Sequence, residues 1–171
     1  MKTRIILTAA IVALLMAALP GLVAAGDQRS APMQTLPGFV EVDGSQVSVN
    51  ATGDRARVTV KTSGLEGHYA YTLWSFSFSK PWNCSGGACG FDDTETAAQR
   101  AAVGYMVQFV AGHPVGGNGK VNFGGTITVP NAAGAEYHIV IADHGVKDPA
   151  QLPEQIKTPS PDGVQIGIIL P

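Results

Sequence analysis

Short segments in which apolar and polar residues alternate dominate this chain from about residue 40 onward. In 55–62, for example, Ala56, Val58 and Val60 share one face of a strand, while basic and polar residues share the other. Gly, Pro, Asn and Asp separate such segments. Further strands are predicted at 46–50, 68–79, 103–110, 136–142 and 164–170, and a hairpin at 115–129 whose return strand is 120–129. The pattern indicates an all-β, antiparallel two-sheet β-sandwich (immunoglobulin-like) of about seven or eight strands.

The longest alternation, at 68–79, has large side chains on both faces. One face holds Ala70, Thr72, Trp74, Phe76 and Phe78, and the other holds Tyr71, Leu73, Ser75, Ser77 and Ser79. The first set is more aromatic, so the sequence predicts that it faces the core. Core packing is the preferred interpretation over a ligand pocket lined by the same aromatic residues.

Turn-forming and helix-forming residues between the strands predict the connections. Asn118-Gly119 lies between apolar segments and suits a tight hairpin turn, because both residues tolerate a positive φ. Residues 92–100 favour one short helix, with Asp93 or Thr94 as its N-cap. The four prolines of 147–163 predict a long loop before the last strand.

The first 25 residues are typical of a signal peptide. Lys2 and Arg4 precede an uncharged apolar stretch, and small residues follow it up to Ala25, after which we predict cleavage; Gly26 is the alternative last residue. An uncleaved anchor is the competing interpretation, but about 15 apolar residues fall short of the roughly 20 that span a bilayer. The chain is therefore expected to be exported, to a periplasm or to the medium.

The remainder of the chain suits a flexible leader at 26–39 and one domain at 40–171. Lys2 and Arg4 account for two of the 11 basic residues, which leaves nine against 13 acidic residues and a net charge near −4. That balance argues against nucleic acid as a partner, and no later segment is apolar enough to predict a membrane span.

Two cysteines, Cys84 and Cys89, enclose only four residues. In an oxidising compartment such a pair predicts a disulfide that fixes a local loop. A redox-active pair is the alternative, although it usually has two intervening residues and opens a helix.

Several motifs resemble a group of exported bacterial proteins of unknown function and, more faintly, chordin-type domains. They are the run Thr-Ser-Gly-Leu-Glu-Gly-His-Tyr-Ala-Tyr-Thr-Leu-Trp at 62–74, Cys84 with Cys89-Gly90, Asp92-Asp93, Gly112-His113-Pro114-Val115, Phe123-Gly124, Glu136-Tyr137-His138-Ile139-Val140, Asp143-His144-Gly145 and Glu154-Gln155-Ile156. The resemblance covers roughly 60–157. It implies an exported β-sandwich with a local disulfide, and no established activity.

Histidines at strand ends are the main candidates for chemistry. His68 opens a predicted strand, while His113 and His144 each close one, so the three could meet at one end of a sandwich. With a nearby aspartate they would suit zinc or copper. His138 is left out, because about 20 Å of extended strand would separate it from His144. Strand capping is the simpler alternative for each imidazole.

Acidic residues after the second cysteine and one tryptophan complete the candidates. Asp92, Asp93 and Glu95 could hold calcium, but helix capping fits them better because the calcium-loop motif is absent. Trp82 lies in the cysteine loop and is a candidate contact residue.

No catalytic motif is legible, so the sequence favours a non-enzymatic binding or interaction module with an unknown ligand or protein partner. A small cell-envelope metalloprotein using zinc or copper is the alternative, and a hydrolase with an unrecognised site is a weaker third.

Overall fold

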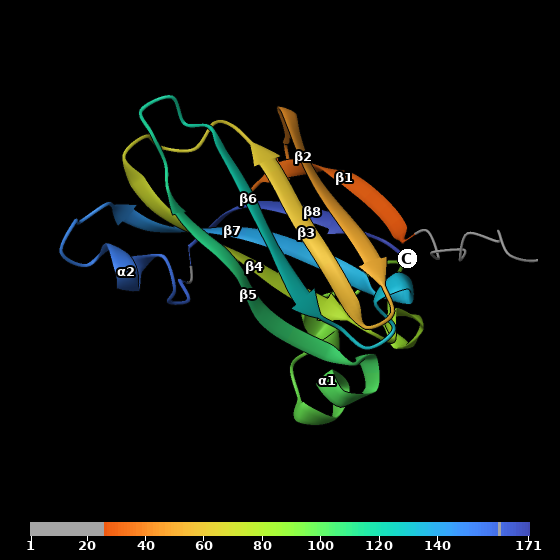
Figure 1. Cartoon of the computed structure of the whole chain (residues 1–171). Helices are drawn as coiled ribbons and strands as arrows, with labels where there is room; N and C mark the ends of the chain where they lie inside the picture. Colours follow the sequence, from red (N-terminus) through yellow and green to blue (C-terminus); the bar gives the residue numbers. More distant parts are fainter. Residues whose placement is uncertain (1–25, 161) are drawn as a thin grey trace, which may run out of the picture.

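The protein was analysed as a computed structural model that describes residues 26–160 and 162–171 (Figure 1). The predicted signal peptide, 1–25, lies outside these residues. Eight strands form most of the fold: β1 (Asp27–Thr35), β2 (Glu41–Thr52), β3 (Arg55–Thr62), β4 (Tyr69–Phe78), β5 (Tyr105–Pro114), β6 (Val121–Thr128), β7 (Glu136–Val146) and β8 (Gly163–Ile169). The helices are short: α1 (Ala97–Val103), α2 (Leu152–Gln155) and the 3₁₀ turns η1 (Pro81–Asn83), η2 (Phe91–Asp93) and η3 (Ala132–Gly134).

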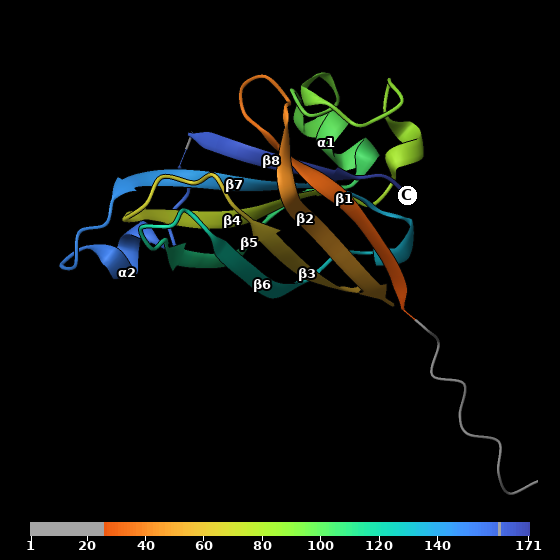
Figure 2. The same cartoon turned by 90° about the horizontal axis from the view of Figure 1, so that it is seen from above.

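All eight strands belong to one antiparallel sheet in the order β5-β4-β7-β8-β1-β2-β3-β6. The sheet curls so that β1, β2, β3 and β6 lie against the half made of β5, β4, β7 and β8 (Figures 1 and 2). Two residue pairs, Gln34–Ile166 and Thr35–Gln165, join the halves through β1 and β8. The all-β class is therefore confirmed, whereas two separate sheets, as in an immunoglobulin-like sandwich, are not.

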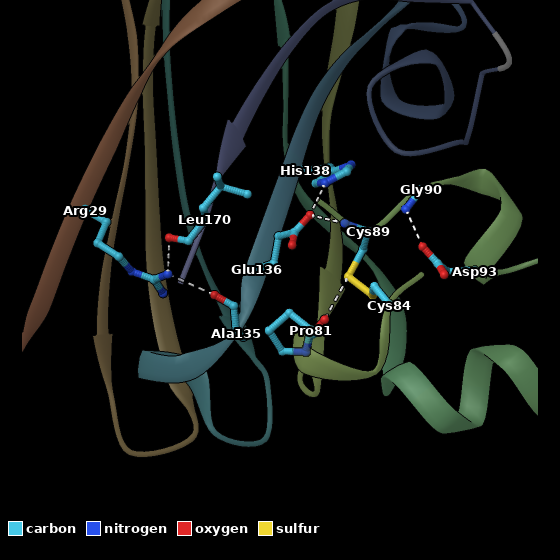
Figure 3. Close-up of polar contacts among 10 residues, drawn as sticks. All are labelled: Arg29, Pro81, Cys84, Cys89, Gly90, Asp93, Ala135, Glu136, His138 and Leu170. Atoms are coloured by element: carbon cyan, nitrogen blue, oxygen red, sulfur yellow. Dashed lines mark hydrogen bonds and ion pairs between the residues drawn. A yellow bond between two sulfur atoms is a disulfide. The ribbon is translucent and has the colours of Figure 1, made fainter. Parts of the chain in front are cut away.

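Side chains bridge the two corners where backbone pairing is sparse. Between β5 and β6, the Gln108 amide accepts from the Thr128 N–H and donates to the Thr128 carbonyl, as a neighbouring peptide unit would. Between β1 and β8, the Arg29 guanidinium donates to the carbonyls of Leu170 and Ala135 (Figure 3). The same group lies over the Tyr137 ring. These contacts satisfy backbone groups that an open sheet edge would leave exposed.

The core fills the space between the halves and draws on strands of both. Val47, Val49, Val58, Leu73 and Ile139 are fully buried in it. The predicted alternation of 55–62 is confirmed, since Ala56, Val58 and Val60 face inward along β3. No helix among the described residues is long and apolar enough to cross a membrane.

The prediction for the faces of β4 was wrong. Tyr71 and Leu73 enter the core together with Ser75 and Ser77, whereas Trp74 and Phe76 lie on the outer side. The register explains this, because Leu73 and Ser75 pair with the core residues Ile141 and Ile139 of β7. The hydroxyl groups of Ser75 and Ser77 are buried and have no hydrogen-bond partner among residues 26–160 and 162–171. The assumption that the more aromatic face of this strand is the inner one was therefore wrong.

The predicted flexible leader was also wrong. Residues 27–35 form β1, which pairs with β2 over most of its length and buries Met33 in the core. The alternation of residues 27–35 was hard to detect because Ala31 and Met33 share the inner face with a charged residue, Arg29. The aliphatic part of this side chain crosses an apolar surface, and its guanidinium donates to backbone carbonyls. The domain thus begins near Asp27 rather than at residue 40.

The predicted connections are confirmed in part. The Cys84–Cys89 disulfide is present with a Cα–Cα distance of 5.2 Å. Gly119 has a φ of 65° in the turn between β5 and β6, but these two strands lie at opposite ends of the strand order, so the predicted hairpin was wrong. The short helix after the disulfide is α1, but its N-cap is Thr96 rather than Asp93 or Thr94. The long loop 147–163 is interrupted by α2.

Candidate binding face

Two rows of side chains cross the outer side of the β5-β4-β7-β8 half. Register places Phe109, Trp74, Val140 and Ile166 in one row, and Val107, Phe76, His138 and Ile168 in the next. We call six of these residues the aromatic face: Trp74, Phe76, Val107, Phe109, Val140 and Ile168. Val107 and Phe109 are 46% and 40% exposed, and the other four are partly exposed. The face carries no charged side chain.

Packing within the sheet holds the aromatic face in place. The rings of Trp74 and Phe109 meet edge to face with their centroids 5.6 Å apart, and Phe76 lies 6.4 Å from Tyr105. Such aromatic pairs stabilise a fixed orientation beyond the area that they bury. The face is therefore a preorganised apolar surface on a paired sheet.

The disulfide loop and α1 cover one end of this outer side (Figures 2 and 3). Phe78, the next outward residue along β4 after Phe76, is buried in a small second core with Cys89 and Val103. Cys84 and Tyr105 pack against the same cluster. This satellite core explains why Phe78 is buried while Phe76, two residues earlier, is not.

The α2 segment covers the other end. Gly112 pairs with Thr72 on the outer side, and a Cβ at Gly112 would overlap the carbonyl of Ile156. The Gln155 side-chain amide donates to the Val146 carbonyl and fastens this segment to β7. Glycine at 112 thus permits the close approach, and the aromatic face lies between two covered regions.

A buried carboxylate connects the disulfide loop to the aromatic face (Figure 3). Glu136 Oε1 lies 2.6 Å from His138 Nε2 and accepts the Cys89 backbone N–H at 2.9 Å. Glu136 is almost fully buried, and the imidazole of His138 stands in the second row of the outer side. The histidine Nε2 donates to this carboxylate, which fixes the ring beside Phe78. The Glu-x-His spacing on one strand, with both side chains on one face, could have revealed this pair from the sequence.

A second polar chain lies under α2. The Trp74 indole N–H donates to Thr72 Oγ1 at 2.9 Å, and the same hydroxyl lies 2.9 Å from His144 Nε2. Burial lowers the pKa of His144, and the nearby Asp143 partly opposes that shift. The tautomer of the His144 imidazole decides which of these two groups donates. Because Thr72 is fully buried, this hydroxyl–imidazole pair gives a substrate no access and offers no support to the hydrolase interpretation.

The three histidines predicted to bind zinc or copper do not converge. Both His113 and Asp143 pair with Tyr71, so the side chain of His144, one residue further along β7, points to the opposite face of the sheet from His113. His68 lies in the loop before β4 with a φ of 67°. Among the described residues, no group of three His, Cys, Asp or Glu side chains could hold a metal ion. The alternation along β5 and β7 therefore separates the side chains of His113 and His144.

The disulfide loop presents the other predicted candidates. Trp82 and Phe91 are 67% and 83% exposed, which keeps Trp82 available for contact. The carboxylate of Asp93 accepts the backbone N–H groups of Gly90 and Ser85, each at 2.8 Å. These bonds lower the pKa of Asp93 and confirm capping, although of η2 rather than of α1.

A polar pocket of about 690 Å³ lies at the end of the sheet where β3 ends and β6 begins. Its lining includes Asp43, Lys61, His113, Asn118 and Lys120. It is separate from the aromatic face, since none of the six residues of that face lines it.

Comparisons with known proteins leave the chain's family open. No protein-family model matches the chain, and a search of curated proteins gives no match. Any functional argument therefore depends on the geometry of the molecule.

Proposed function

We propose that this chain is an exported, non-enzymatic binding module that contacts a protein partner through the aromatic face. The observation that carries the proposal is a preorganised apolar surface, with Val107 and Phe109 at 46% and 40% exposure, between two covered regions of the same sheet. Uncovered, contiguous apolar surface on a soluble domain is typical of an interaction site. The interior of the sheet is filled by its own side chains, so the outer side is the more suitable contact region.

The composition of the surface favours a protein partner. Tryptophan, phenylalanine and valine at the centre, with His138 at the side and Trp82 and Phe91 in the neighbouring loop, match the apolar core and more polar rim of protein interfaces. Aromatic anchors held by a rigid scaffold also lose little conformational entropy when they bind.

Export is part of the proposal. The charged and apolar pattern of the first 25 residues supports it, and the Cys84–Cys89 disulfide is compatible with an oxidising compartment. The resemblance to exported bacterial proteins supports the same location, in a periplasm or outside the cell.

Site-specific photocrosslinking tests the contact surface. We would place p-benzoylphenylalanine at Val107 on the aromatic face and, as the matched control, at Thr126 on the outer side of the other half. In cells that export the protein, we expect one discrete protein adduct from position 107, lost in the Phe109→Ser variant, and none from position 126. Equal adducts from both positions, no adduct, or an adduct with only a second copy of this chain would overturn the proposal.

A further inference from the structure

The outer side of the β1-β2-β3-β6 half has a different chemistry. Strand β3 directs Arg55, Arg57 and Lys61 outward in one line. Arg29–Asp27 and His138–Glu136 are the two close contacts between a basic and an acidic side chain found among the described residues, so these three cations form no ion pair with the described part of the chain. No Asp or Glu occupies an outward position next to them on β2 or β6.

Each of the three cations lies between two neutral hydrogen-bonding side chains. Register places Arg55 between Thr52 and Thr128, Arg57 between Asn50 and Thr126, and Lys61 between Gln46 and Asn122. Neighbouring strands lie about 4.8 Å apart, and the line from Arg55 to Lys61 measures about 20 Å along an extended strand. We call these nine residues the basic face.

The basic face continues into the polar pocket. Lys61 and Asn122 belong to both, and the pocket adds Lys120, His113 and Asn118 against the single carboxylate of Asp43. A linear ligand along β3 would therefore end in a concave site of about 690 Å³ with the same excess of basic groups.

From this arrangement we infer that the basic face and the pocket bind a linear acidic polysaccharide, of the uronate class. Carboxylates at intervals along the chain complement Arg55, Arg57 and Lys61, and arginine recognises a carboxylate through two parallel hydrogen bonds. The amide and hydroxyl groups between the cations complement sugar hydroxyl groups.

Glycan fits this face better than nucleic acid. Proteins that bind single strands combine basic grooves with aromatic side chains on which the bases stack. The basic face has no aromatic residue on β2, β3 or β6 at an outward position. The aromatic residues of the fold's surface are concentrated on the opposite half, so the inference is independent of the proposed function.

Binding of an oligogalacturonate tests this inference directly. Calorimetric titration would compare the full mature protein with the triple variant R55Q/R57Q/K61Q and with the matched control K80Q/K147Q/K157Q, which removes three exposed lysines elsewhere. Thermal unfolding would verify that both variants are folded. We expect binding that weakens with salt, at least about tenfold weaker in the first triple variant and unchanged in the control.

Two further probes make the test specific. The methyl-esterified oligogalacturonate has the same sugars without free carboxylates, and we expect it not to bind. No binding of the acidic oligomer, equal loss in both triple variants, or tighter binding of a single-stranded DNA oligomer would overturn the inference. Because none of these variants alters the aromatic face, photocrosslinking at Val107 remains a separate readout of the proposed function.

Discussion

The two outer sides of this sheet are built by the same alternation and have opposite chemistry. On the β5-β4-β7-β8 half, outward positions hold Trp74, Phe76, Val107 and Phe109, and further segments pack over both ends. On the β1-β2-β3-β6 half, outward positions hold Asn, Gln, Thr and three basic residues that form no ion pair with the described residues. The first half therefore depends on additional segments that cover its apolar residues. The second half presents its own polar side chains to solvent and needs no such cover.

Because of this difference, we expect substitutions in the two halves to affect stability and binding separately. The aromatic half needs the disulfide loop, α1 and α2 to bury Phe78, Thr72 and Gly112, so changes beneath these covers should destabilise the fold. The polar half tolerates solvent at every outward position, so changes there should alter binding and leave folding intact.

The largest effect is expected from Glu136→Ala, beneath the cover of the aromatic half. The change leaves the buried Cys89 N–H and the His138 ring without their acceptor. We expect the free energy of unfolding to fall by about 3 kcal/mol, measured by urea denaturation. The exposed Glu154 on α2 is the control, and Glu154→Ala should change stability by less than about 0.5 kcal/mol. A loss below about 1 kcal/mol for Glu136→Ala would show that the cover does not depend on this carboxylate.

Removing the disulfide should have the next largest effect. In the double variant C84S/C89S the loop over Phe78 and Val103 loses its covalent closure. We expect a loss of about 2 kcal/mol from the chain-entropy effect of so short a loop. Reduced wild-type protein should unfold at the same urea concentration as the variant. If the reduced and oxidised wild-type proteins unfold together, the disulfide does not stabilise the cover.

The sequence predicted one half of this comparison better than the other. On β3 the outward residues are basic or polar and the inward ones are Ala56, Val58 and Val60, so alternation alone identified the core face. On β4 both faces carry bulky groups, and the burial of Leu73 follows from pairing with β7, which no single strand reveals.

The same limit applies to the candidate site. The disulfide could be predicted, because local spacing determines it. The contact role of Trp82 stays a prediction. The opposite directions of the His113 and His144 side chains could not be predicted, since they depend on the register with Tyr71. Strand β1 could not be predicted, because Arg29 occupies an inward position and donates to carbonyls that only the folded chain brings close to it.

The stability of the fold should depend on pH through His144, which lies beneath α2 on the aromatic half. Burial lowers the pKa of His144, so the folded state favours the neutral imidazole. The unfolded chain then binds more protons, and stability falls as the pH decreases from about 6.5 toward the lower pKa of the folded state. Denaturation between pH 7.5 and 5 should show a shallower decline for His144→Asn than for wild type. His113→Asn changes an exposed imidazole and should keep the wild-type decline. The same decline in all three proteins would show that His144 is not the cause of the pH dependence.

The smallest effect on stability, and the sharpest comparison of the two faces, is expected from a pair of isosteric exchanges. Val107→Thr adds a hydroxyl to the aromatic face, and Thr126→Val removes one from the outer side of the other half. Both positions are exposed, so each change should alter the free energy of unfolding by less than about 0.5 kcal/mol. Retention on a hydrophobic interaction column should decrease for Val107→Thr and increase for Thr126→Val, because each exchange alters the apolar area open to solvent. Unchanged retention of Val107→Thr would mean that the aromatic face is already covered in solution. The two outer sides would then differ as an interface and a free surface, rather than as two free surfaces.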